Sequence, residues 1–214
     1  NPKPIGAQVG LGVKVSAVST EFEQGELTAS TGDFDFAIQG NGFFMIEMPD
    51  GTTGYTRNGN FLMAINPNGG TTLTTADGYS VLDSNGKAIT FDAATDTTRL
   101  SFDNYGNIFY KNAQGVIQPT GVRIGAAQFN NPSGLTKLGD SYFAESAASG
   151  NARIEGQDAA LSVSVIKNGY LEASSVQAVD EMVDMIVTQR AYEMNSKAIT
   201  ASDEMLQQAN NLRS

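Results

Sequence analysis

Two groups of acidic residues have a spacing that could support chemistry. Asp33 and Asp35 flank a phenylalanine, and glycoside cleavage needs two such carboxylates placed across a cleft. Asp180 and Asp184 share one helical face, with Glu181 beside them, and hard cations prefer oxygen ligands of this kind. We expect instead that the first pair points outward from a strand whose Phe residues face the core. The second group is expected to be solvated near a positive helix N-terminus.

The remaining candidate motifs are incomplete. Residues 83–86 (Asp-Ser-Asn-Gly) match only a fragment of a calcium loop, and residues 40–42 (Gly-Asn-Gly) lack the strand–turn–helix context of a nucleotide fingerprint. The chain has no His and no Cys, which excludes Ser-His-Asp and Cys-His catalysis, disulfides and the usual zinc sites. We therefore predict a protein that is not an enzyme, with no catalytic, cofactor-binding or metal site.

Composition narrows the class of partner. The net charge is -10, whereas nucleic-acid binding needs clustered Lys and Arg, and an acidic surface disfavours anionic membranes. There is no apolar run long enough to span a bilayer. Hydrophobic residues make up 40% of the chain, enough for a folded core. We expect a protein partner and neither nucleic acid nor membrane insertion.

Most of the chain is predicted to be β-structure. All 11 Phe residues lie at or before Phe143, and turn signals such as Asp50-Gly51 and Asp77-Gly78 recur between short alternating runs. Gly, Asn and Asp tolerate positive φ, so strands at this spacing indicate successive hairpins. We expect a sandwich-like or barrel-like β-domain over residues 33–166.

The C-terminal part reads as one long helix. After Gly169 there is no further Gly, and Ser174 with Gln177 three residues on fits a capping box. We expect a helix over 174–214, roughly 55–60 Å long at 1.5 Å per residue. That length exceeds the width of a small β-domain, so part of the helix must project.

One face of this helix carries an alternating three-and-four spacing, which suits coiled-coil packing. We name it the assembly seam, and its residues are Val176, Val183, Val187, Ala191, Met194, Ala198, Ala201, Met205 and Leu212. Asp180 and Gln208 interrupt the spacing. The alternative is a helix lying flat on its own β-domain; the narrow Ala-rich stripe favours a helical partner. Glu193 and Lys197 are spaced for an ion pair, and Arg190 and Tyr192 are candidates for polar contacts with a neighbouring subunit.

Two short segments, one at each end of the predicted β-domain, have similar sequences. Residues 25–30 (Gly-Glu-Leu-Thr-Ala-Ser) and 169–174 (Gly-Tyr-Leu-Glu-Ala-Ser) match at four of six positions; chance is the competing explanation. We expect the two segments to pair where the chain enters and leaves the domain. Residues 1–32 and 167–173 would then form the connectors.

The sequence resembles a known family, the flagellar rod and hook proteins of bacteria, and most closely its distal rod members. The matching motifs span nearly the whole chain in the family's order: Gln8–Val13 with Phe22–Gly25, Phe36–Phe44 with Asp50-Gly51 and Tyr55–Gly59, and Glu181–Ile186 with Gln189–Glu193, Asn195–Lys197 and Met205-Leu206.

The resemblance implies a structural subunit that self-assembles into a helical tube, a drive shaft that transmits torque and encloses the export channel. It implies a coiled-coil inner domain with a β-rich outer shell. The implied partners are further copies, proximal rod and hook subunits, the surrounding ring bushing and the flagellar export apparatus. The implied location is the periplasmic rod of the basal body, reached without a cleaved signal peptide. The family's N-terminal helix is absent and Asn1 would follow it. We therefore expect that this chain alone polymerises poorly, or that its helix pairs with another chain or frays.

Other functions remain open at this stage. Within the family, a hook or proximal rod subunit is the alternative, although the short interval between the motifs at Phe43-Phe44 and Glu181-Met182 favours a rod protein. Outside it, a secreted adhesin would show a concave ligand site and no helical assembly. A cell-wall hydrolase would depend on Asp33 and Asp35.

Overall fold

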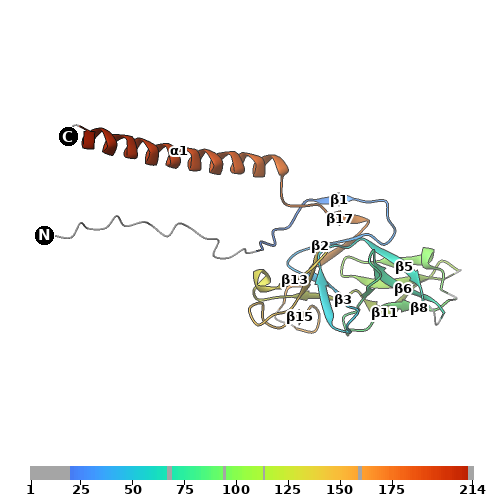
Figure 1. Cartoon of the computed structure of the whole chain (residues 1–214). Coiled ribbons are helices and arrows are strands. Elements are labelled where there is room, and N and C mark those ends of the chain that lie inside the picture. Colours follow the sequence, from blue (N-terminus) through green and yellow to red (C-terminus); the bar gives the residue numbers. More distant parts are fainter. Residues whose placement is uncertain (1–19, 67–68, 94, 113, 159–160, 212–214) are drawn as a thin grey trace.

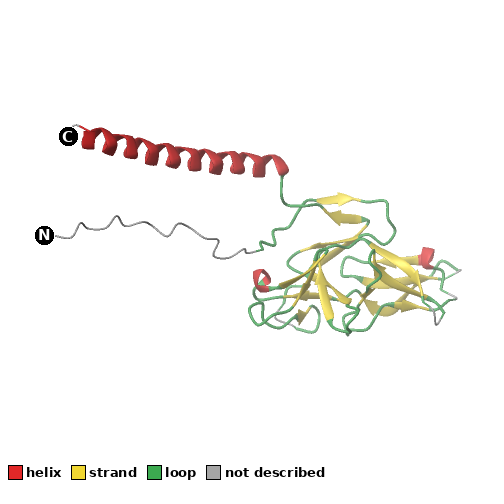
Figure 2. Cartoon of the chain, in the orientation of Figure 1, coloured by secondary structure: helices red, strands yellow, loops and turns green. Residues whose placement is uncertain are grey.

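The computed structural model describes residues 20–66, 69–93, 95–112, 114–158 and 161–211. It shows a β-domain and one long helix that leaves it (Figures 1 and 2). The strands are β1 Leu27–Ala29, β2 Phe36–Gln39, β3 Phe43–Glu47, β4 Thr53–Thr56, β5 Phe61–Ile65, β6 Thr71–Thr75, β7 Ser80–Val81, β8 Thr90–Phe91, β9 Leu100–Phe102, β10 Asn107–Lys111, β11 Ile117–Arg123, β12 Ala126–Gln128, β13 Thr136–Gly139, β14 Tyr142–Ala144, β15 Arg153–Ile154, β16 Val165–Asn168 and β17 Tyr170–Glu172. Two 3-10 helices span Thr97–Arg99 and Pro132–Gly134, and α1 spans Ala178–Asn211.

The strands pair as antiparallel neighbours. The largest sheet runs in the order β13-β14-β4-β3-β7-β6-β5, with β12, β15 and β8 attached to it. A three-stranded sheet has the order β11-β10-β9, and two further pairs are β16-β2 and β1-β17. The prediction of a mainly β protein built from hairpins with one long C-terminal helix is confirmed.

Strand β3 separates two hydrophobic cores. Alternate side chains of a strand point to opposite faces, so Phe43 and Met45 join one core while Phe44 joins the other. The first core also contains Phe129, and the second contains Phe36. Burial on both faces explains why β3 reads as a continuous apolar run rather than an alternating one. Each fully buried Phe contributes about 1.5–3 kcal/mol.

Short polar turns join the strands as predicted. Asp103 accepts hydrogen bonds from the backbone N–H of Tyr105 and Asn107 at 2.9 and 2.8 Å, and Gly106 takes φ 77°. Asp83 does the same for Asn85 and Lys87, at 2.7 and 2.9 Å. The calcium-like fragment is therefore a hairpin whose carboxylate caps its own backbone.

Helix α1 begins at Ala178, later than the predicted start at Ser174. The capping-box prediction is wrong, because the Ser174 hydroxyl accepts from Val176 N–H and the Gln177 carbonyl accepts the first helical bond from Glu181. The 34-residue helix is about 51 Å long at 1.5 Å per residue. None of the described helices is long and apolar enough to cross a membrane.

Candidate assembly site

The connectors entering and leaving the β-domain form a two-stranded antiparallel ribbon, β1–β17. Leu27 pairs with Glu172 and Ala29 with Tyr170, so the pairing predicted from the two similar segments is confirmed. The two segments are also close just outside the strands, at Gly25, where a Cβ atom would lie 1.8 Å from the carbonyl oxygen of Ala173. Only glycine fits there without moving backbone.

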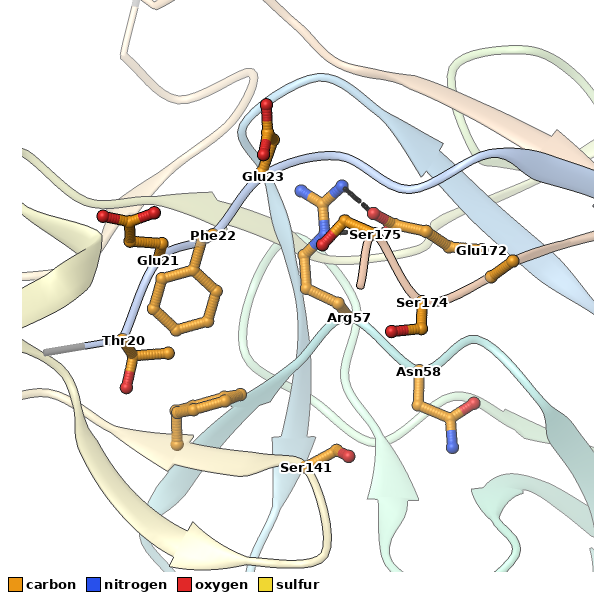
Figure 3. A pocket seen from close by; sticks show the side chains of 12 residues that line it. Thr20, Glu21, Phe22, Glu23, Arg57, Asn58, Ser141, Glu172, Ser174 and Ser175 are labelled. Atoms are coloured by element: carbon orange, nitrogen blue, oxygen red, sulfur yellow. Dashed lines mark hydrogen bonds and ion pairs between the residues drawn. The ribbon is translucent and has the colours of Figure 1, made fainter. Parts of the chain in front are cut away.

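One arginine joins this ribbon to the β-domain. Arg57, which follows β4, donates from Nε to Glu172 Oε2 and from Nη2 to Glu172 Oε1, both at 3.0 Å. Its Nη1 donates to the carbonyl oxygens of Gly40 and Gly42 at 2.7 and 2.9 Å. Glu172 also accepts from Gly25 N–H at 2.9 Å. Figure 3 shows Arg57 reaching toward Glu172.

A buried carboxylate, that of Glu155, packs against the Gly40–Gly42 turn. Glu155 is 1% exposed, and it accepts from the Ser164 N–H and hydroxyl at 2.7 and 2.6 Å and from Gln128 Nε2 at 2.7 Å. A Cβ on Gly42 would lie 2.7 Å from Glu155 Oε1. Residues 40 and 41 form a bend between β2 and β3, and side chains at positions 40 and 42 would meet Ser164 and Glu155.

An open cleft of about 470 Å³ lies beside this junction. Its walls come from the incoming segment at Phe22, from Phe143 of β14, and from the outgoing segment at Ser174 and Ser175. Figure 3 shows Arg57 between Phe22 and Ser174. Among the described residues that line the cleft, Arg57 is the cation, and it is already bound to Glu172. These residues show no arrangement of acid, base and nucleophile.

Two phenols near this junction are held in their neutral form. Burial raises the pKa of Tyr55 to about 12, and the Glu145 carboxylate adds to the rise. Burial also raises the pKa of Tyr142 to about 12, and the hydrogen bond of this phenol to Asp77 is the second cause of the rise. Both phenols act as hydrophobic packing groups with one polar end.

The structure separates the paired acids that could have supported chemistry. Asp33 is exposed, but Asp35 is 5% exposed and accepts hydrogen bonds from Ser30 Oγ and, at 2.8 Å, from Asn60 Nδ2. The prediction that Asp35 points outward is wrong, because its carboxylate ties the connector to the start of β5. A buried, hydrogen-bonded Asp35 does not face a cleft opposite Asp33.

The acidic group on α1 lies as predicted. Asp180 and Glu181 stand in the first turn of the helix, and both are exposed, as is Asp184. Within the described residues, no group of three or more acidic side chains is placed to hold a metal ion.

Most of the assembly seam lies on α1, which the other described residues of the chain leave uncovered. Every described side chain of α1 is exposed except Glu193, which is half-buried. The large seam residues on α1 are Val183, Val187, Met194 and Met205, exposed at 52%, 60%, 65% and 64%. Val176 is also exposed, but it precedes α1, so the prediction that places it on the helix is wrong. Leu212 lies outside the described residues. Contiguous apolar exposure of this kind marks an interaction surface.

The polar side chains on α1 that were candidates for contacts between subunits do not form the predicted Glu193–Lys197 ion pair. Arg190 Nη1 lies 2.9 Å from Glu193 Oε2, so the ion pair of Glu193 is formed one turn earlier than the predicted pair with Lys197. Tyr192 is 76% exposed. The exposed pair contributes only a few tenths of a kcal/mol to the helix, so these groups remain available to a neighbouring chain.

Sequence reasoning missed the Arg57–Glu172 pair and Glu155. The matching motif at Tyr55–Gly59 contained Arg57 but gave no hint of its partner, which lies 115 residues away. No local sequence pattern indicated this pairing, because it depends on which distant segments the fold brings together.

Comparison with known proteins finds family matches for both the β-domain and the C-terminal helix. Residues 37–110 match the family model of the flagellar hook protein FlgE/F/G D1 domain, and residues 167–212 match that of the flagellar basal body rod FlgEFG protein C-terminal region. The chain is 39% identical over 213 residues to the flagellar basal-body rod protein FlgG of Borreliella burgdorferi, covering 99% of this chain and 76% of the relative. The chain is 41% identical to FlgG of Bacillus subtilis, covering 96% of this chain and 75% of the relative. It is also 41% identical to FlgG of Agrobacterium fabrum, covering 94% of this chain and 73% of the relative.

Proposed function

This chain belongs to the family of flagellar basal-body rod proteins FlgG, structural subunits of the distal rod, and from that premise we propose that it self-assembles into a helical tube. The tube acts as a drive shaft that transmits torque to the hook and encloses the export channel. The observation that carries the proposal is α1, a 34-residue helix whose apolar side chains are exposed along its length.

The apolar residues of α1 support burial on more than one side. At about 100° per residue, the assembly seam occupies one face of the helix. A second row recurs every seventh residue on roughly the opposite face, with exposed fractions of 65–76%: Met185, Tyr192, Ile199 and Leu206. A helix that is apolar on two faces is stable when it has neighbours on both. A subunit packed within a tube wall has such neighbours.

Each part of the chain has a different role in the proposed assembly. Residues 174–214 supply the inner coiled-coil layer, residues 33–166 supply the outer shell and its lateral contacts, and residues 1–32 and 167–173 connect the two. The small side chains of Ala191, Ala198 and Ala201 let helices approach closely, while methionines fill irregular gaps. Polar contacts between subunits come from Arg190, Tyr192, Glu193 and Lys197.

The same proposal fixes the partners and the location. Proximal rod subunits lie below the polymer and hook subunits above it, with a ring bushing around it. The subunit reaches the periplasmic rod through the flagellar export apparatus, without a cleaved signal peptide. The absence of cysteine from the sequence is compatible with this route.

Electron microscopy of the full gene product that contains this chain tests the proposal. Tubes with a central channel are expected, and monomers under all conditions would contradict it. Ala198→Asp places a charge in the assembly seam and should abolish the tubes while leaving the far-UV spectrum of the β-domain unchanged. Gln189→Asp adds the same charge away from the seam and should assemble normally. Equal assembly by both variants would remove the seam from the mechanism.

A further inference from the structure

The β1–β17 ribbon is a continuation of the β2–β16 pair, bent sharply at its base. Asn168 pairs with Phe36 in the lower pair, and Tyr170 already pairs with Ala29 in the ribbon. Only Gly169, with φ 76°, separates the two partners on the outgoing strand. This left-handed conformation favours glycine, so the bend is built into the chain at one residue.

Backbone hydrogen bonds hold the base of the ribbon. Gly169 N–H donates to the Asp35 carbonyl, and Ser30 N–H donates to the Gly169 carbonyl, both at 2.8 Å. The carboxyl group of Asp35 accepts from the Ser30 hydroxyl. The base is therefore a defined pivot that remains in place whatever happens at the far end.

The far end of the ribbon is held mainly by side chains. Glu172 is the last residue of β17, and its carboxylate is held by the bidentate contact with Arg57 described above. Gln24 Nε2 adds a hydrogen bond to the Ile38 carbonyl at 2.8 Å. The Arg57 and Glu172 side chains are only 18% and 11% exposed. A pair this shielded from water is stronger than a surface pair and is costly to break.

We propose that the Arg57–Glu172 pair is a latch that fixes the direction in which α1 leaves the β-domain. Glu172 lies a few residues before the start of α1 at Ala178, so the ribbon is the arm that carries the helix. With both ends held, the arm cannot rotate about its base. Without the latch, the arm swings about Gly169 while its own strand pairing survives.

This inference rests on the proposed function for its consequence. In a drive shaft, force on the outer β-domain must reach the inner helix through the two connectors, and the latch makes that path stiff. Arg57 is accordingly a positioning residue, because it touches the ribbon and the Gly40–Gly42 turn and acts on α1 through them.

Electron-spin distance measurement tests the latch directly. The chain has no native cysteine, so labels at Thr28→Cys in the ribbon and Asn85→Cys in an exposed hairpin report one distance. The parent protein should give a single narrow peak. Arg57→Gln and Glu172→Gln should each lose that peak to a broad distribution, with Arg57→Lys intermediate because a lysine cannot make the bidentate contact.

The matched control is Arg153→Gln, which removes the ion pair of Arg153 with Asp158 inside the β-domain. It should destabilise the fold and leave the distance peak narrow. Unchanged peaks in both latch variants would overturn the inference, as would equal broadening in the control. Near-UV circular dichroism of the buried tyrosines confirms that each variant is folded. If the full gene product forms no tubes while the latch variants still broaden, the proposed function fails and the latch stands.

Discussion

Glu155 accepts two hydrogen bonds from Ser164, one from its backbone N–H at 2.7 Å and one from its hydroxyl at 2.6 Å, and both residues are buried. A buried carboxylate is costly unless donors surround it. Here a third donor, Gln128 Nε2, completes the set at 2.7 Å. The arrangement places the Glu155 carboxylate against Gly42, whose carbonyl oxygen accepts from Arg57.

Replacing this carboxylate tests that role. Glu155→Gln puts an amide NH₂ where donors already converge, so at least one donor is left unpaired. We expect a loss of about 1.5–3 kcal/mol in the free energy of unfolding, the range for hydrogen bonds to charged groups. Urea unfolding measures it. Glu47→Gln, on an exposed side chain of β3, is the control and should change stability by less than about 0.5 kcal/mol.

The close approach at Gly25 gives a local prediction. Gly25→Ala brings a Cβ against the Ala173 carbonyl oxygen, so the two strands must separate. The amide of Ala173, which donates to the Glu26 carbonyl at 2.9 Å, should lose its protection from hydrogen exchange. Gly51→Ala adds a Cβ in open space at φ 79°; it should cost about 1 kcal/mol through backbone strain without affecting Ala173. Retained protection in Gly25→Ala would contradict the close contact.

Stability should fall at alkaline pH. The pKa values of Tyr55 and Tyr142 are raised from 10.0 to about 12 in the fold. A raised pKa means that the folded state holds the proton more tightly, so this contribution is complete below pH 10 and is lost as the pH rises toward 12. Phenolate absorbance should show late ionisation for these two tyrosines. Tyr142→Phe should make the loss of stability shallower; an identical pH profile would show that Tyr142 ionises freely.

Acid should weaken the β9–β10 hairpin. Burial acts to raise the pKa of Asp103, but hydrogen bonds from Asn107 and Tyr105 outweigh it and hold the pKa below its ordinary value of 3.8. A lowered pKa gives stability that is present above that ordinary value and is lost as the pH falls through the folded pKa. Asp103→Ala should cost about 1–2 kcal/mol at neutral pH and much less in acid. A loss that is the same at both pH values would show that the charge is not responsible.

The hairpins and the long helix could be predicted from the sequence, because both depend on local residue types. The hairpins followed from turn residues, since Asp, Asn and Gly fix local backbone geometry without help from the rest of the fold. The long helix followed from the absence of Gly and Pro after Gly169. Its start was misplaced, because the Ser174 hydroxyl had a closer alternative in the Val176 amide.

The sequence by itself determined the β-domain, the helix and its apolar faces, and the pairing of the two connectors, because each rests on local propensity, periodicity or a repeated segment. Only the tertiary structure decided that Asp35 turns inward, that Glu155 lies in the interior, and that Arg57 meets Glu172. Those outcomes depend on which distant backbone groups lie within hydrogen-bonding reach once the chain has folded. A linear pattern of residue types does not contain that information, because the free energy of a buried charge is set by its neighbours in space.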